Sequence, residues 1–179
     1  EMCIRDRNWK RPAEEVNGLL KILEGAIDRE LESLHEAGVR IRHIGRTDRI
    51  PSDLLQKIQR AVHYTRNNTE LILNVAMDYG GRAEIVDAVK RMLADGLSPD
   101  AVDEATVSRY LYTGDLPDPD LIIRTSGEYR VSNFMIWQAA YAEYYVTDVL
   151  WPDFDERELQ RAIEHFTKRE RRFGGLKVR

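Results

Sequence analysis

Apolar residues recur at steps of three and four along several stretches of the chain, which is the spacing of amphipathic helices. The first such helix begins at Pro12, where a missing N–H costs nothing, and ends at Gly38, which can adopt a left-handed cap conformation. Further helices are expected from Pro51, after the Gly80-Gly81 turn, over residues 103–110, and from Asp155, where Glu158 completes a capping-box-like start. The residues expected to face the core are Val16, Leu19, Leu20, Leu23, Ile27, Leu31 and Leu34; Leu54, Leu55, Ile58, Ala61 and Val62; Ile85, Val86, Val89, Met92 and Leu93; and Leu159, Ala162, Ile163 and Phe166.

Shorter β-rich runs lie between these helices. Residues 39–44 alternate β-branched side chains with arginine, and further strands are expected from Leu121 and over residues 144–146. Residues 71–76 form a nearly continuous apolar run, which predicts a strand buried on both faces. Alternating strands and helices with short connections predict an α/β fold, a mostly parallel sheet flanked by helices.

Composition narrows the function classes. A net charge of −4 lacks the basic footprint of a nucleic-acid binder, so no nucleic-acid partner is expected. No apolar run approaches the roughly 20 residues needed to span a bilayer. The single cysteine, Cys3, excludes an internal disulfide and fits a cytoplasmic protein.

The candidate chemistry gathers after the Leu121 strand. Arg124, Arg130 and Ser132 lie within nine residues of sequence that also contain Gly127. Guanidinium groups match phosphate oxygens bidentately, so two of them beside a hydroxyl suit a diphosphate. Downstream, Glu143 could hold a metal ion against that diphosphate, although one carboxylate could equally pair with an arginine.

Ligands of open α/β sheets bind beyond the carboxyl ends of the strands. Residues 78–82, Asp-Tyr-Gly-Gly-Arg, follow such an end, as would residues 8–12 if a strand precedes them. The glycine turn could present backbone amides to an anion, or could simply be a tight strand-to-helix turn. It has neither the phosphate-loop spacing nor the dinucleotide-binding spacing, which disfavours a nucleotide-binding domain.

Taken together, these segments resemble the motifs of the cis-prenyltransferases, and most of all bacterial undecaprenyl diphosphate synthases. The matching stretches are residues 8–12, 78–82, 124–134, 137–143, 151–154 and 171–175, in the family's order, so the resemblance covers nearly all of residues 8–175. It implies condensation of isopentenyl diphosphate with an allylic diphosphate, with a new cis double bond in each cycle. An undecaprenyl-type polyprenyl diphosphate would be the product, in a cytoplasmic homodimer that could meet the membrane through its lipid product.

The resemblance also implies roles for individual residues. Asn8 would help remove the proton, and Glu143 would bind Mg²⁺. Leu71 would lie at the closed end of a product tunnel. Substrate would be bound by Trp9, Arg11, Arg124, Arg130, Val131, Ser132, Arg172 and Gly174, and the last two would reach the site across a dimer interface.

The chain departs from the family at its start. The family's Asp-Gly-Asn-Gly-Arg-Trp motif, whose aspartate is the main magnesium ligand, is absent. We therefore expect residues 1–7 to be a junction or non-native segment, residues 8–175 a single domain that lacks the first strand and helix, and residues 176–179 a tail. On this basis the chain is expected to turn over little by itself, although its parent is an active prenyl transferase.

Two smaller departures concern Asp78, where asparagine is common, and Arg46, where aspartate is often seen. We expect neither to touch the assigned chemistry. The alternative to an enzyme is a non-catalytic partner subunit of a two-component cis-prenyltransferase, because such subunits also lose substrate-site residues. Against it, Arg124, Arg130, Ser132 and Glu143 are all present.

Overall fold

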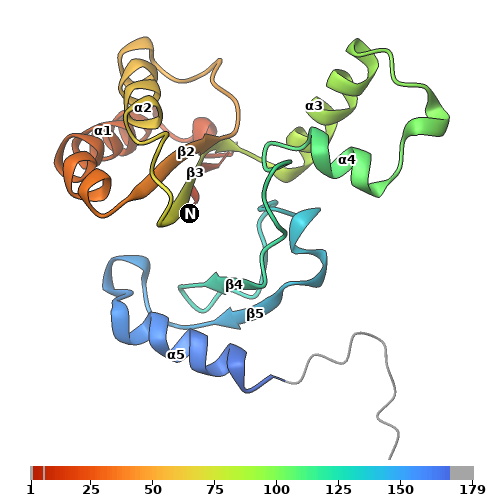
Figure 1. Cartoon of the computed structure of the whole chain (residues 1–179). Helices are drawn as coiled ribbons and strands as arrows, with labels where there is room; N and C mark the ends of the chain where they lie inside the picture. Colours follow the sequence, from red (N-terminus) through yellow and green to blue (C-terminus); the bar gives the residue numbers. More distant parts are fainter. Residues whose placement is uncertain (1, 6, 170–179) are drawn as a thin grey trace, which may run out of the picture. The chain divides into compact units, whose positions relative to one another are not determined.

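The computed structural model describes residues 2–5 and 7–169 of the chain (Figure 1). These residues belong to two compact units, 1–116 and 117–179. A single domain over residues 8–175 therefore stays a prediction.

The first unit contains a parallel three-stranded sheet with the strand order β1-β3-β2. In β2 (Val39–Ile44) and β3 (Leu71–Tyr79) the pairing is regular from one end of β2 to the other. β1 (Met2–Arg5) pairs with the last part of β3, with irregular register. These residues lie in the segment expected to be a junction, and their backbone forms a strand of the sheet.

Helices follow the strands in this unit. α1 (Ala13–Glu36) begins directly after Pro12, and α2 (Ser52–Tyr64) directly after Pro51, as predicted. Gly38 ends the first of these segments with φ of +73°, the left-handed conformation expected of it. α3 (Gly81–Ala94) and α4 (Glu104–Tyr110) complete the unit, and Asp103 caps α4 by accepting a hydrogen bond from the backbone N–H of Thr106. The α/β class with parallel strands is thus confirmed (Figure 1).

The core of the first unit lies between α1, α2 and the sheet. Its buried members come from the predicted apolar stripes of α1 and α2, together with Ile50 before α2 and Met77 of β3. Trp9 packs against this core from the turn before α1. The buried cluster consists of Val16, Leu20, Ile50, Leu54, Ile58 and Met77.

Two helices bury a different face from the predicted one. In α3 the buried residues are Gly81, Glu84, Ala88 and Met92, whereas Val86, Val89 and Leu93 are exposed. Glu84 can be buried because the Tyr79 hydroxyl and the Tyr112 backbone N–H both donate to its carboxylate. The predicted apolar stripe of α3 was therefore wrong at Val86, Val89 and Leu93. Apolar spacing alone cannot show that a glutamate on another face of the helix has hydrogen-bond partners that allow its burial.

The last helix shows the same kind of deviation. α5 (Glu156–Thr167) buries Glu158 and Ala162, while Leu159 and Ile163 are each 42% exposed. Its start agrees with prediction, because Asp155 accepts hydrogen bonds from the backbone N–H groups of Arg157 and Glu158.

The first residues of β3 also differ from prediction. Leu71 is 58% exposed and Ile72 is 40% exposed, and full burial begins only at Ala76. Within the predicted run only the last residue, Ala76, is fully buried, and the buried part of β3 continues from there to Tyr79, where β1 pairs with it.

The second unit is built on two parallel strands, β4 (Leu121–Arg124) and β5 (Glu143–Val146). An 18-residue connection joins them, and α5 follows β5. The short 3-10 helices of the described chain are η1 (Asn8–Lys10), η2 (Pro99–Ala101), η3 (Gln138–Tyr141) and η4 (Trp151–Asp153).

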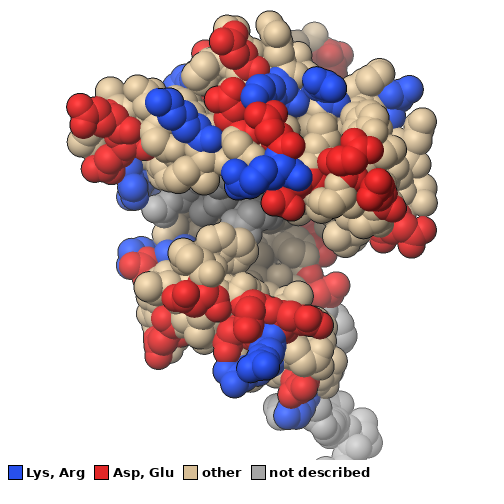
Figure 2. Space-filling model, turned by 90° about the vertical axis from the view of Figure 1, so that its left-hand side faces the viewer, with Lys and Arg blue, Asp and Glu red and all other residues tan. Residues whose placement is uncertain are grey.

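No helix among the described residues combines the length and the apolarity needed to cross a membrane. Basic and acidic side chains are interspersed on the face seen in Figure 2, with no extended patch of one sign.

Candidate substrate site

The carboxyl ends of three parallel strands meet at one edge of the first unit's sheet. Beyond β1 comes the 3-10 turn Asn8–Lys10, beyond β2 the loop that begins at Gly45, and beyond β3 the Gly80-Gly81 turn. The sequence analysis placed residues 8–12 at such an edge if a strand precedes them, and β1 meets that condition. Parallel α/β sheets bind their ligands at this edge.

Asp78 is the central polar residue of this edge. Its side chain is fully buried, and its Oδ1 accepts a hydrogen bond of 2.8 Å from the indole Nε1 of Trp9. Arg49 pairs with both carboxylate oxygens, through Nε at 3.0 Å to Oδ2 and through Nη2 to Oδ1. The guanidinium of Arg49 also lies over the Trp9 ring, 5.4 Å from its centroid.

Asp78 was expected to lie apart from the assigned chemistry, yet its carboxylate directly contacts Trp9, a residue with an expected role in substrate binding. Only the family comparison at that position drew attention to Asp78. The signal that could have identified it is its place as a carboxylate at the end of an apolar strand run. A buried carboxylate there requires a cationic or N–H partner.

A second carboxylate–arginine pair lies beside the first. Arg46 donates two hydrogen bonds of 2.8 Å to Asp87, and the Tyr112 hydroxyl donates one of 2.6 Å to the same carboxylate. The hydrogen bonds from Arg46 lower the pKa of Asp87 to about 2. Arg46 thus joins the loop after β2 to α3, and nothing in its contacts reaches residues 8–12.

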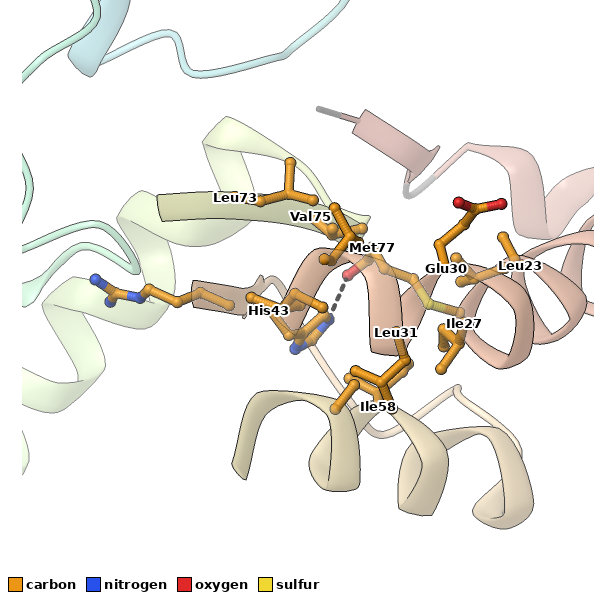
Figure 3. Close-up of a pocket in the computed structure, with 14 residues that line it drawn as sticks. Leu23, Ile27, Glu30, Leu31, His43, Ile58, Leu73, Val75 and Met77 are labelled. Atoms are coloured by element: carbon orange, nitrogen blue, oxygen red, sulfur yellow. Dashed lines mark hydrogen bonds between the residues drawn. The ribbon is translucent and has the colours of Figure 1, made fainter. Parts of the chain in front are cut away.

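Behind this edge, the first unit contains an apolar cavity of about 220 Å³ (Figure 3). α1, α2 and the two strands β2 and β3 supply its walls. Leu23, Ile27, Leu31, Ile58, Leu73, Val75 and Met77 line it, among other residues.

His43, on β2, is one of three polar side chains in the cavity wall, with Glu30 and Arg42, and it bonds to the backbone of the adjacent strand β3. Its Nε2 lies 3.2 Å from the carbonyl oxygen of Met77 (Figure 3). Burial lowers the pKa of His43, so the imidazole is neutral near pH 7 and donates this hydrogen bond without placing a charge beside the cavity.

Leu71 does not line this cavity. Leu73, two positions along β3 and on the same side of the strand, does so instead. Leu71 itself lies at the first position of β3, at the far end from Asp78, and is largely exposed.

In the second unit, Arg124 and Arg130 converge on one carboxylate. Arg124 Nη2 lies 2.6 Å from Glu128 Oε2, and Arg130 Nη2 binds the same oxygen. These contacts, led by the hydrogen bond from Arg124, lower the pKa of Glu128. The structure thus brings the two predicted arginines together, around a glutamate to which the sequence analysis gave no role.

Arg124 still has one donor to offer. Its Nε is buried and has no hydrogen-bond partner among the described residues. A buried unpaired N–H is uncommon and calls for an explanation such as a ligand. An anion at the carboxyl end of β4 would satisfy it.

The loop after β4 has an unusual backbone. Ser126, Ser132, Asn133 and Met135 all have positive φ, between 45° and 68°, as does Gly127 at 63°. Left-handed non-glycine residues cost energy and collect at functional sites. Ser132 is among them, and Val131, next to it, accepts a hydrogen bond from the backbone N–H of Phe134.

Glu143 lies apart from the arginine pair. It pairs in the sheet with Leu121, whereas Arg124 pairs with Val146, so the two residues sit at opposite ends of the β4–β5 ribbon. Three residues of strand separate those ends by roughly 10 Å. A carboxylate oxygen of Glu143 lies 3.3 Å from Nη1 of Arg169.

These positions do not form a magnesium site by themselves. No group of three or more His, Cys, Asp or Glu side chains within residues 7–169 is arranged to hold a metal. Glu143 is one carboxylate, already paired with an arginine, and does not fit the ion alone.

The remaining predicted residues are placed as follows. Arg11 lies just after η1, exposed, with a guanidinium nitrogen 3.6 Å from Glu15. Asn8 is half-buried at the start of η1. Arg172 and Gly174 lie outside the described residues.

Comparison with known proteins identifies the family. The family model described as "Putative undecaprenyl diphosphate synthase" matches residues 4–174. An isoprenyl transferase of Heliobacterium mobile is 54% identical over 175 residues, which is 96% of this chain and 67% of the relative. The ditrans,polycis-undecaprenyl-diphosphate synthase ((2E,6E)-farnesyl-diphosphate specific) of Escherichia coli K12 is 47% identical, over 94% of this chain and 68% of the relative.

A solved structure agrees. Lavandulyl diphosphate synthase from Lavandula x intermedia, in complex with dimethylallyl diphosphate, has a TM-score of 0.92 and 34% sequence identity. The match covers 97% of this chain and 77% of that one. This chain therefore belongs to the undecaprenyl diphosphate synthase family of prenyl transferases.

Proposed function

We propose that this chain carries out cis-prenyl chain elongation, in which isopentenyl diphosphate is condensed with an allylic diphosphate to give a polyprenyl diphosphate. Because it lacks the Asp-Gly-Asn-Gly-Arg-Trp motif, we expect its turnover by itself to be low. Its relatives bear the names of enzymes that make or transfer such chains. None of those names supports the alternative of a non-catalytic partner subunit.

The observation that carries the proposal is the apolar cavity behind the carboxyl edge of the first unit's sheet. A growing isoprenoid is a hydrocarbon, and an apolar cavity binds it by removing apolar surface from water. The neutral state of His43 adds no further charge to a wall that also contains Glu30 and Arg42. The carboxyl edge of the same sheet, with the turn that carries Trp9, is the polar end where a diphosphate head would have to stay.

In the proposed reaction the allylic C–O bond breaks as a new carbon–carbon bond forms to isopentenyl diphosphate. Diphosphate leaves, and loss of a proton from the new chain gives the cis double bond. Donors aimed at the departing diphosphate lower the barrier. An amide is a poor base, so Asn8 would orient the reactants, and the released diphosphate would accept the proton.

The second unit supplies the groups proposed for isopentenyl diphosphate. Arg124 and Arg130 carry the forked donors that suit a diphosphate, and Ser132 adds a hydroxyl. Because both arginines contact Glu128, an incoming diphosphate would have to take that carboxylate's place on at least one of them.

Magnesium enters this proposal with the substrates, since diphosphates bind it through their own oxygens. Glu143 would add a single carboxylate, and we assign it no step. A homodimer in the cytoplasm is likewise proposed on the resemblance alone, and analytical ultracentrifugation would test the dimer.

Two measurements test the proposed function. Isothermal titration calorimetry with isopentenyl diphosphate and with farnesyl diphosphate, each with Mg²⁺, should show saturable binding of both. Incubation with radiolabelled isopentenyl diphosphate and farnesyl diphosphate should then give label extractable into butanol. Inorganic phosphate serves as the control ligand. If neither diphosphate binds more tightly than phosphate does, the proposal is wrong.

A further inference from the structure

We propose that Asp78 is a positioning residue for this reaction, which orients the Asn8–Lys10 turn through the indole N–H of Trp9. The inference rests on the proposed function, because it assigns the allylic substrate to that turn. It gives a role to a residue that the resemblance marked only as a departure from the family's usual asparagine.

The contacts around Asp78 form a closed triangle. Trp9 donates to Oδ1, Arg49 donates to both oxygens, and Arg49 stacks on the Trp9 ring. Each of the three side chains therefore restrains the other two. The triangle ties the turn before α1 to the loop after β2 and to the end of β3, which are the three segments at the carboxyl edge.

The backbone of Asp78 supports a specific placement of its carboxylate. Its φ is +51°, a left-handed value that a non-glycine residue seldom adopts, although aspartate tolerates it better than most. Its carbonyl oxygen also accepts a hydrogen bond of 3.2 Å from the backbone N–H of Arg46. The end of β3 is thus turned and held there, with the side chain toward Trp9 and Arg49.

Among the residues that the structure describes, few other contacts anchor the turn. η1 has no side-chain cap, and none of its three residues is fully buried. Its backbone hydrogen bonds, from Lys10 N to Arg7 O and from Arg11 N to Asn8 O, are local. The Trp9 side chain, which packs on the core and donates to Asp78, is therefore what fixes the turn's orientation.

A stability role alone does not account for this arrangement. The neighbouring Arg46–Asp87 pair already joins the loop after β2 to the following helix, with two hydrogen bonds of 2.8 Å. A buried ion pair is in general no more stabilising than apolar residues of the same volume. What Asp78 adds is a fixed orientation of the Trp9 side chain, because its carboxylate accepts the hydrogen bond from the Trp9 indole N–H.

The test uses three variants and a matched control. Asp78→Gly removes the carboxylate and tolerates the positive φ. Asp78→Asn keeps an oxygen for the Trp9 N–H, and Trp9→Phe removes that N–H. The control, Asp87→Asn, removes the carboxylate charge of the neighbouring arginine pair, which does not reach the turn.

The first readout is the Trp9 indole ¹⁵N–¹H resonance in the protein without substrate. It should move in Asp78→Gly, move less in Asp78→Asn and stay in place in Asp87→Asn. This readout does not depend on any activity of the chain. An unchanged indole resonance in Asp78→Gly would overturn the contact on which the inference rests.

The second readout is substrate affinity and turnover. Asp78→Gly and Trp9→Phe should each weaken farnesyl diphosphate binding, or lower kcat at saturating substrate, by about tenfold, as expected for a lost charge-assisted hydrogen bond. The double variant should be no worse than either single one. Asp78→Asn should recover most of the loss, while affinity for isopentenyl diphosphate stays within about twofold of wild type.

The outcomes separate the two proposals. If the wild-type chain binds no farnesyl diphosphate, the proposed function fails and the role of Asp78 fails with it. If the wild-type chain binds it and Asp78→Gly, Trp9→Phe and Asp87→Asn all behave alike, the proposed function stands and Asp78 is merely structural. Should Asp78→Gly not fold, Asp78→Asn and Trp9→Phe decide the question by the same comparison.

Discussion

At the scale of single residues, several arginines form close ion pairs with carboxylates. Arg46 and Arg49 each hold a carboxylate through two hydrogen bonds, and Arg124 and Arg130 share Glu128. Planar guanidinium groups suit such forks better than lysine does. The arginines of the carboxyl edge and of the loop after β4 are thus oriented before any ligand arrives.

Arg124 should dominate anion binding by the second unit. Replacing it, as Arg124→Ala, removes both the contact to Glu128 and the unpaired Nε donor. We expect affinity for inorganic pyrophosphate to fall about tenfold or more, as for a lost charged hydrogen bond. Calorimetry measures this, with Arg161→Ala in α5 as the control for loss of one exposed arginine. Equal losses in the two variants would refute a specific role for Arg124.

The Arg46–Asp87 pair should shape the acid stability of the first unit. The pKa of Asp87 in the folded protein, about 2, lies below the ordinary value of 3.8. The pair's contribution to the free energy of unfolding is therefore present above pH 4 and is lost as the pH falls toward 2. Such a shift sets an upper bound of about 2 kcal/mol, and we expect about 1 kcal/mol because the Arg46 side chain is 36% exposed. Asp87→Asn should therefore flatten the stability profile between pH 4 and 2 in urea unfolding. The same slope in the variant would contradict this.

At the scale of secondary-structure elements, sequence periodicity predicted the starts of α1, α2 and α5 and the strand residues 39–44. These depend on local chemistry: proline, a capping aspartate and β-branched runs. The buried faces of α3 and α5 could not be predicted, because burial of Glu84 depends on Tyr79 and Tyr112, and Tyr112 is 28 residues away along the chain. The contacts of Asp78 could not be predicted for the same reason, since its partners lie 69 and 29 residues away along the chain.

The turn after β2 should depend on glycine at position 45. Its φ is +125°, and an added Cβ would lie 2.1 Å from the carbonyl oxygen of Met77. Gly45→Ala should lower the free energy of unfolding by about 2 kcal/mol or more, because neither the backbone at residue 45 nor that at Met77 can move without strain. Gly18→Ala is the matched control: Gly18 lies in α1 with open space around it and should gain about 0.5–1 kcal/mol. Urea midpoints that change in the same direction for both would contradict the account.

The cavity should limit product length. Ala26 lines it from α1, and Ala26→Phe places a ring in a space of about 220 Å³. We expect products shorter by at least one isoprene unit, resolved by thin-layer chromatography of the dephosphorylated lipids. Ile22→Phe, on an α1 position that is 68% exposed, should leave the length unchanged. If Ala26→Phe makes full-length product at the normal rate, the growing chain does not occupy this cavity.

At the scale of the whole molecule, the two units differ sharply in how much core they contain. Among the described residues, the buried hydrophobic side chains of the second unit are Ala139 and Ala162, whereas the first unit buries large ones such as Leu54, Ile58 and Met77. Small cores rarely sustain a fold, because buried area must offset chain entropy.

We therefore expect the units to behave differently when separated. Residues 1–116 should unfold cooperatively in urea, and residues 117–179 should show little helix in far-ultraviolet circular dichroism. Adding the first unit in trans is the control for a second unit that needs a partner. Cooperative unfolding of 117–179 alone would show that its few buried side chains suffice.

The pairing of β1 has a consequence for synthesis on the ribosome. Met2 of β1 pairs with Ala76 of β3, so the strand leaves the ribosome long before its partner does. At about 5–20 residues per second, that wait lasts roughly 4–15 seconds. Throughout it, the backbone of β1 offers unpaired N–H and C=O groups to any other strand. During that interval the nascent chain would depend on a chaperone or on rapid elongation to keep β1 from pairing with another strand, a need that ends once β3 has paired with it.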